Sequence, residues 1–185
     1  MDRNKILDAF RQINVWKRGD ERAPHKPLLV LLALGKYLNG EDRLIPFSEI
    51  NGRLKALLED FGPARPSVHP EYPFWRLQRD RLWEVQSDGE LTRRTGNTDI
   101  PQAELLRKNA RGGMPEEYYE AITRDPSLAR QIASTLLDGH FPPSIHEDIL
   151  EATGLDLTAC ETETVQRVKR DPAFRERVIS AYEHK

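Results

Sequence analysis

Apolar residues recur at helical spacing in the first part of the chain. The positions are Ile6, Phe10, Ile13 and Trp16, with Leu7 beside them. A spacing of three or four residues places side chains on one face of an α-helix, so residues 2–17 are predicted to be helical and to end at Gly19 and Asp20. Residues 28–38 are apolar on almost every side. They predict a second helix, which starts at Pro27 and lies at the centre of the core.

Alternation of apolar and polar residues marks a different kind of element. FWRLQ at residues 74–78 and LWEVQ at residues 82–86 each put apolar side chains on one face and polar ones on the other, and RDR joins the two segments. This pattern predicts a β-hairpin. RLIPF at residues 43–47 predicts a short strand at the edge of a sheet, because Pro46 lacks the N–H that an inner strand needs.

Proline, glycine and capping residues divide the rest of the chain. Ser48 predicts the start of a helix, whose apolar face is formed by Ile50, Leu54, Leu57 and Leu58. Five of the thirteen residues in 61–73 are Gly or Pro, which predicts a rigid loop without regular structure.

The second half is predicted to be helical. Helices are expected over 101–109, from Pro115, from Asp125-Pro126 to residue 138 before Gly139, and from a Ser144/Glu147 capping box to Gly154. A linker at 155–164 and a last helix from Asp171-Pro172 follow. The order predicts a mainly α fold with a small β part (α+β), winged-helix-like, with the hairpin as a two-stranded wing. Many unrelated proteins share this order, so it does not by itself define a function.

Charge is distributed unevenly along the 185 residues. The formal net charge is −2, but residues 1–115 hold 20 Lys and Arg against 16 Asp and Glu, whereas residues 116–185 hold 8 against 14. A basic first part suits contact with phosphates, although many neutral proteins divide in the same way. The single cysteine, Cys160, excludes a disulfide framework, and no apolar run is long enough for a membrane span. A reducing cytoplasm is the expected location.

Known catalytic motifs are not found in the sequence. It contains no Walker loop, no GxGxxG, no HExxH and no Gly-x-Ser-x-Gly. His140 and His146 flank a Pro-Pro turn, which leaves open either a metal site or, more simply, polar surface residues near a helix cap. We therefore expect a chain that is not itself an enzyme and that needs no metal or cofactor.

Three segments could bind an anion. RAPHKP at residues 22–27 puts His25 and Lys26 at the start of the central helix, where free N–H groups attract phosphate; the alternative is a rigid turn with solvated charges. Tyr72 and Pro73 stand in a stiff aromatic loop, which could equally be packed on the core. Arg111, before Gly112 and Gly113, could reach a base edge or a phosphate, or could simply follow a helix end.

Together these segments resemble a known family. RAPHKPLLVLLALG, HPEYPFWRLQRDRLWEV, LLRKNARGGMPEEYYEAI and GHFPPSIHEDILEATGL occur in this order, and they are similar to the sulfur-binding domain of McrA-like type IV restriction endonucleases, which cleave phosphorothioate DNA. The resemblance covers about residues 5–155. RDPAFRERVISAYEHK at the end resembles the helix that leads into the HNH nuclease domain of such bacterial proteins. It implies a binding domain at 1–155, a linker and helix at 156–185, and a nuclease domain beyond this chain.

The resemblance also implies site residues. His25 and Lys26 would contact the modified phosphate region, Tyr72 and Pro73 would form the apolar sulfur cavity, and Arg111 and Gly112 would reach neighbouring bases. Further candidates for DNA contact are Arg22, Asn109 and Arg79. Two departures stand out: Lys26 replaces an arginine of some relatives, and Arg76 stands where a small residue can line the cavity. We expect Arg76 to contact a DNA phosphate.

The expected function is therefore binding of phosphorothioate-modified double-stranded DNA as the targeting module of an endonuclease. Three other interpretations stay open at this point. The acidic C-terminal part could belong to a protein–protein interaction module, and the basic part could bind DNA without regard to sulfur. A complete nuclease with an unrecognised site is a third.

Overall fold

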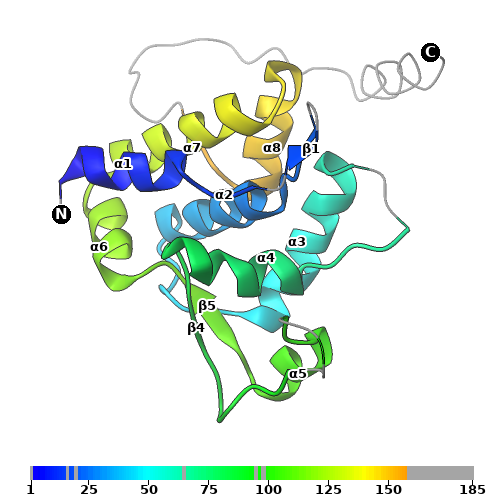
Figure 1. The fold of residues 1–185 in the computed structure, drawn as a ribbon. Helices are drawn as coiled ribbons and strands as arrows, with labels where there is room; N and C mark the ends of the chain where they lie inside the picture. The colour runs from blue at the N-terminus through cyan, green and yellow to red at the C-terminus, as the bar shows by residue number, and fades with distance from the viewer. Residues whose placement is uncertain are drawn as a thin grey trace.

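The computed structural model describes residues 2–15, 17–18, 21–63, 66–93, 96 and 99–157 (Figure 1). Several predictions fall outside the described residues. They are the last helix, most of the linker predicted at 155–164, Trp16, and the helix end predicted at Gly19 and Asp20. The elements in chain order are α1 (Arg3–Arg11), β1 (Lys17–Arg18), β2 (Glu21–Arg22), α2 (His25–Leu38), β3 (Ile45–Pro46), α3 (Phe47–Phe61), α4 (Glu71–Arg76), the 3-10 helix η1 (Leu77–Asp80), β4 (Glu84–Gln86), α5 (Gln102–Arg107), β5 (Arg111–Gly113), α6 (Glu116–Arg124), α7 (Pro126–His140), the 3-10 helix η2 (Pro143–Ile145) and α8 (His146–Thr153).

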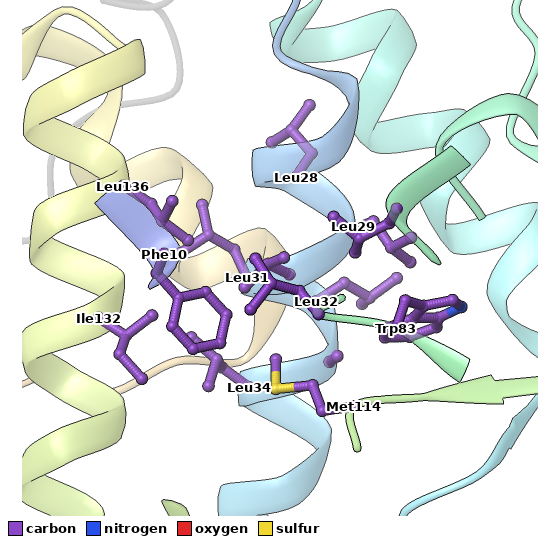
Figure 2. Close-up of a cluster of buried hydrophobic side chains, with 14 of the residues drawn as sticks. Phe10, Leu28, Leu29, Leu31, Leu32, Leu34, Trp83, Met114, Ile132 and Leu136 are labelled. Atoms are coloured by element: carbon purple, nitrogen blue, oxygen red, sulfur yellow. The ribbon is translucent and has the colours of Figure 1, made fainter. Parts of the chain in front are cut away.

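Helix α2 forms the centre of the molecule, as its composition predicts. Every residue from 27 to 37 is buried. Phe10 of α1 with Ile132 and Leu136 of α7 pack on one side of it, and Trp83 and Met114 pack on another (Figure 2). Such a helix is stable only when other elements surround it, so α2 fixes the positions of the elements around it.

The sheet has three short antiparallel strands in the order β3-β5-β4. β3 lies at an edge, which confirms the prediction made from Pro46. The central strand β5 is formed by residues 111–113, which the sequence predicts to be only a helix stop. Glycine is needed here, because a Cβ on Gly112 would lie 2.5 Å from Trp83 Nε1 and one on Gly113 would lie 1.9 Å from the Arg43 carbonyl oxygen.

The predicted hairpin over 74–78 and 82–86 is wrong. Residues 71–76 form α4 and 77–80 form η1, so β4 pairs with β5 and not with the segment before it. Helical spacing at Pro70, Phe74 and Leu77 buries all three on one face, and this tertiary burial overrides the local alternation. The end of the predicted loop at 61–73 is helical for the same reason. The two-stranded wing is therefore absent from this part of the chain, and the structure is mainly helical with a small sheet.

Several helix ends differ from the prediction. α1 ends at Arg11, and Ile13 and Val15 are buried around an exposed Asn14, as in an extended segment. α3 begins at Phe47 after Pro46, so Ser48 is not its cap. α8 begins at His146, after η2, so the Ser144/Glu147 capping box is also wrong.

Two other predicted helix ends, at Asp125 and Gly154, are confirmed, and the predicted end at Gly139 is wrong. Asp125 caps α7 by accepting a hydrogen bond from the backbone N–H of Ser127 at 3.0 Å. α7 continues past the predicted end and includes Gly139. Gly154 ends α8 in the left-handed conformation, with φ +72°. In the described part of the chain, the helices are too short or too polar to span a bilayer.

Lys36 is the most deeply buried charged residue of α2, with 2% of its surface exposed. Its ammonium group donates to Glu41 at 2.5 Å and also to Glu49. Burial acts to lower the pKa of Lys36, but the bonds to Glu41 and Glu49 outweigh it and raise the pKa above its ordinary value. A buried charge persists when it is paired in this way, so Lys36 anchors the chain that follows α2.

We expect two glycine-to-alanine substitutions to change the free energy of unfolding in opposite directions. Gly154→Ala should lower the free energy of unfolding by about 1 kcal/mol, because a side chain disfavours the left-handed conformation at φ +72°. Gly52→Ala, on an exposed turn of α3 with nothing within 4 Å of the added Cβ, should raise it by about 0.5–1 kcal/mol. Urea unfolding of both variants checks the pair, and equal effects would contradict it.

Candidate nucleic-acid interface

The start of α2 holds the first predicted pair, but its two members differ. His25 is the first residue of the helix and is half-buried. Lys26 is bound inside the fold, because its Nζ donates to Asp80 Oδ2 at 2.5 Å and to the Asn14 carbonyl oxygen at 2.9 Å. Its side chain is only 15% exposed. The charge of Lys26 is thus already compensated by Asp80.

Helix α4 holds the second predicted pair. Tyr72 is half-buried, whereas Pro73 is buried and faces the interior. The ring of His69 stacks on the ring of Tyr72, with centroids 4.6 Å apart and 17° between the planes. The guanidinium carbon of Arg76 lies 4.6 Å from the centre of the same ring. Tyr72 is therefore held in a stack of two neighbours.

His69 belongs to a short hydrogen-bonded chain that the sequence did not reveal. Its Nδ1 lies 3.0 Å from Glu71 Oε1 and its Nε2 lies 3.0 Å from Ser67 Oγ. Glu71 is 7% exposed, and its Oε2 has no hydrogen-bond partner among the described residues. The three residues alternate along the chain, and this spacing could have suggested the contact. These two hydrogen bonds fix the orientation of the His69 imidazole against the Tyr72 ring.

Arg76 makes a two-point contact with Asp99. Its Nε donates to Oδ1 at 2.8 Å and its Nη2 donates to Oδ2 at 2.5 Å. The hydrogen bonds from Arg76 hold the pKa of Asp99 below its ordinary value, against the opposing effect of burial. The Arg76 side chain is still 44% exposed, while that of Asp99 is 5% exposed. Asp99, like His69 and Glu71, is a residue at this surface to which the sequence did not point.

The third predicted segment lies on the sheet. Arg111 is exposed at the start of β5, and Gly112 is buried. Asn109 has a positive φ of 46° and donates to Asp88 Oδ2 at 2.8 Å. Arg79 is exposed on η1. Arg22 lies in β2, paired with Lys17.

Helix α4 and η1 connect these places. Asp80 of η1 reaches the start of α2 through Lys26, and the Phe74 ring of α4 lies against Gly112 of β5. In Figure 1, α4 lies between α2 and the strands β4 and β5, and it contacts α2. The segments of the sequence prediction therefore lie on adjacent elements, with Tyr72 and Arg76 on the element between the other two.

Beside α4 there is an open groove of about 710 Å³. Trp75, Val85 and Leu91 form its apolar part, and the Arg93 guanidinium carbon lies 5.8 Å from the centre of the Trp75 ring. Trp75 is half-buried and packs against the edge of the core, so part of its ring faces the groove.

One of the two histidines beside the Pro-Pro turn contacts the end of α7. His146 Nε2 lies 2.9 Å from the Phe141 carbonyl oxygen. Within the residues that the structure describes, no group of three His, Cys, Asp or Glu side chains is arranged to hold a metal ion.

Comparison with known proteins gives one family. The model of the "ScoMcrA-like, DNA sulfur-binding domain" family matches residues 3–158. No curated protein sequence matches the chain.

Solved structures with the same fold include two from ScoMcrA bound to DNA. Its sulfur binding domain and SRA domain, complexed with phosphorothioated DNA, share 26% identity with a TM-score of 0.74, covering 93% of this chain and 55% of that one. Its sulfur binding domain alone, also complexed with phosphorothioated DNA, shares 27% identity with a TM-score of 0.71, covering 80% and 94%.

A third structure extends the comparison to the type IV phosphorothioation-dependent restriction endonuclease ScoMcrA. It shares 25% identity with a TM-score of 0.67, and the match covers 93% of this chain and 32% of that one. The chain thus spans about half of the two-domain structure and about a third of the endonuclease.

Proposed function

This chain belongs to the ScoMcrA-like family of DNA sulfur-binding domains, and on that basis we propose that it binds double-stranded DNA in which sulfur replaces a non-bridging phosphate oxygen. The observation that carries the proposal is the family match over residues 3–158, which includes all three candidate segments. The complexes of ScoMcrA domains with phosphorothioated DNA support it.

In this proposal the sulfur lies against Tyr72. Sulfur is larger and more polarisable than oxygen and is poorly hydrated, so an aromatic surface favours it by dispersion and desolvation. The half-buried ring of Tyr72 supports this role. Pro73, which is buried, would form the inner wall of the cavity and not its mouth.

The surrounding phosphates would be held by basic groups on the adjacent elements. His25 lies at the N-terminus of α2, where backbone N–H groups attract anions, and Arg76, Arg79 and Arg111 are exposed on α4, η1 and β5. Arg22 and Asn109 are further candidates for contact. Gly112 would bring Arg111 close to the bases, and the three-stranded sheet would take the place of the predicted wing.

We further propose that the chain is the targeting module of a type IV restriction endonuclease and does not itself cut DNA. Its match to part of full-length ScoMcrA supports this division of labour. Residues 1–155 would form the reading domain, and residues 156–185 would connect it to an HNH nuclease domain.

Titration of matched duplexes tests the proposal. Two duplexes of one sequence, one with a single Rp phosphorothioate, are titrated at fixed salt by fluorescence anisotropy. We expect the modified duplex to bind more tightly at every salt concentration, and both affinities to fall as salt rises, because phosphate contacts release counterions. Equal affinities would leave only a general DNA-binding domain, and no binding to either duplex would favour a protein–protein module.

A further inference from the structure

Lys26 of α2 and Arg76 of α4 have unequal freedom to bind a phosphate at the surface. The Lys26 ammonium group donates hydrogen bonds inward, to Asp80 and to the Asn14 carbonyl oxygen. Arg76 is nearly three times more exposed than Lys26, at 44% against 15% of the side chain. A phosphate at Tyr72 would therefore meet Arg76 before Lys26.

The way in which Asp99 holds Arg76 leaves donors available. A guanidinium group carries five N–H bonds, and Asp99 takes the one on Nε and one on Nη2. The remaining N–H bonds, two on Nη1 and one on Nη2, are not bound by Asp99. Because Asp99 itself is 5% exposed, a DNA strand at this surface would meet the guanidinium and not the carboxylate.

We propose that Asp99 is a positioning residue that fixes the Arg76 guanidinium beside Tyr72, and that Arg76 in this position supplies the side-chain hydrogen bonds to the modified phosphate, while Lys26 serves the fold. This inference rests on the proposed function. It assigns the sulfur to the ring of Tyr72 and the neighbouring phosphate oxygen to Arg76, which lies over that ring.

Fixing a long side chain before binding favours discrimination. An unconstrained arginine can move to hydrogen-bond the phosphate in either orientation, so it discriminates poorly between oxygen and sulfur. It also loses its rotamer freedom when the complex forms. An arginine already held at two points has lost that freedom, and its planar group presents donors in one direction. A guanidinium group fixed in this way stabilises the orientation in which the larger sulfur lies on Tyr72 and the phosphate oxygen faces Arg76.

Asp99 could affect DNA binding in two ways, by neutralising the charge of Arg76 or by positioning its guanidinium group. The two effects predict different results for Asp99→Asn. If Asp99 only neutralises Arg76, Asp99→Asn should tighten binding to both duplexes alike and steepen the salt dependence. If Asp99 positions Arg76, Asp99→Asn should reduce the preference for the modified duplex by about tenfold, which corresponds to the loss of one charge-assisted hydrogen-bonding arrangement. The second result is expected, and the first would overturn the inference.

Arg76→Lys provides a test that does not depend on a buried position. The variant keeps the charge but cannot form two parallel bonds with Asp99. We expect the salt dependence to stay as in the unsubstituted chain and the preference for the modified duplex to fall about tenfold. Full retention of the preference would overturn the inference.

The matched control is another arginine–carboxylate pair. Arg107 of α5 donates through Nε and Nη2 to Glu104, at 3.0 and 2.6 Å. Glu104→Gln should leave the preference unchanged. Circular dichroism and thermal melting establish that each variant is folded at the titration temperature.

The outcomes separate this inference from the proposed function. Equal affinity of the unsubstituted chain for both duplexes would contradict the proposed function itself. A preference that persists in both Asp99→Asn and Arg76→Lys would leave the proposed function intact and contradict only the role of Asp99 and Arg76.

A double variant tests whether the two residues act together. In Arg76→Ala/Asp99→Asn, the loss of preference for the modified duplex should equal that of Arg76→Ala alone, and additive losses would contradict a joint action.

Discussion

The Tyr72→Ala variant is expected to bind modified and unmodified duplexes with nearly equal affinity. A single change of one atom in an apolar pocket is worth about 1–3 kcal/mol, or roughly 10- to 200-fold in affinity. Tyr72 supplies the aromatic surface in the proposed cavity, and removing its ring leaves water around the sulfur. We therefore expect most of this preference to be lost while binding to the unmodified duplex changes little, because the basic groups remain.

Tyr72→Phe is the matched control for the ring. It keeps the stack with His69 and the surface under Arg76 but lacks the hydroxyl group. We expect it to keep most of the preference, as measured by anisotropy titration with the same duplex pair at fixed salt. If Tyr72→Ala retained the full preference, the sulfur would have to lie elsewhere.

The second large effect is expected from Lys26→Ala, and it concerns stability. Lys26 and Asp80 form an ion pair whose side chains are 15% and 8% exposed. Removing one partner of such a pair leaves the other charge with poor solvation, so the free energy of unfolding should fall by about 3 kcal/mol. Urea unfolding monitored by circular dichroism measures the loss. The variant should bind both duplexes less well under conditions in which part of it is unfolded.

A double substitution distinguishes this role from phosphate binding. Lys26→Met/Asp80→Leu replaces the pair with apolar side chains of similar size, which is often neutral for stability. We expect it to recover most of the stability lost in Lys26→Ala and to retain the preference for the modified duplex. Loss of DNA binding in a stable double variant would show instead that Lys26 contacts the phosphate directly.

The sequence predicted those parts of the fold that depend on local chemistry. The almost entirely apolar segment 28–38 predicted a central helix. The side chain of Asp125 and the conformational freedom of Gly154 predicted helix ends at those two residues. The hairpin failed because residues 74–78 satisfy both alternation and helical spacing. Only the burial of Phe74 and Leu77 against the rest of the fold decides between the two.

The sequence could nominate candidate site residues, but it could not show which residues they contact in the fold. Lys26, Tyr72 and Arg76 could be named from their motifs. Their partners could not be named in the same way, because Asp80 lies 54 residues after Lys26 and Asp99 lies 23 residues after Arg76. Contacts between residues so far apart in sequence depend on how the elements pack. The spacing of residues along the sequence does not show this packing. The burial of Pro73 could not be predicted for the same reason, since it follows from the position of Pro73 in helix α4 and not in a loop.

In the proposed arrangement, with Arg111 beside the bases, the packing of β5 limits how a base preference could be engineered. Side chains at positions 112 and 113 would collide with Trp83 Nε1 and with the Arg43 backbone, so most variants at either position would lose the sheet. Position 111, at the exposed start of the same strand, carries no such restriction. A selection library for new sequence contexts should therefore diversify residue 111 and keep both glycines, which would concentrate the screened clones on folded proteins.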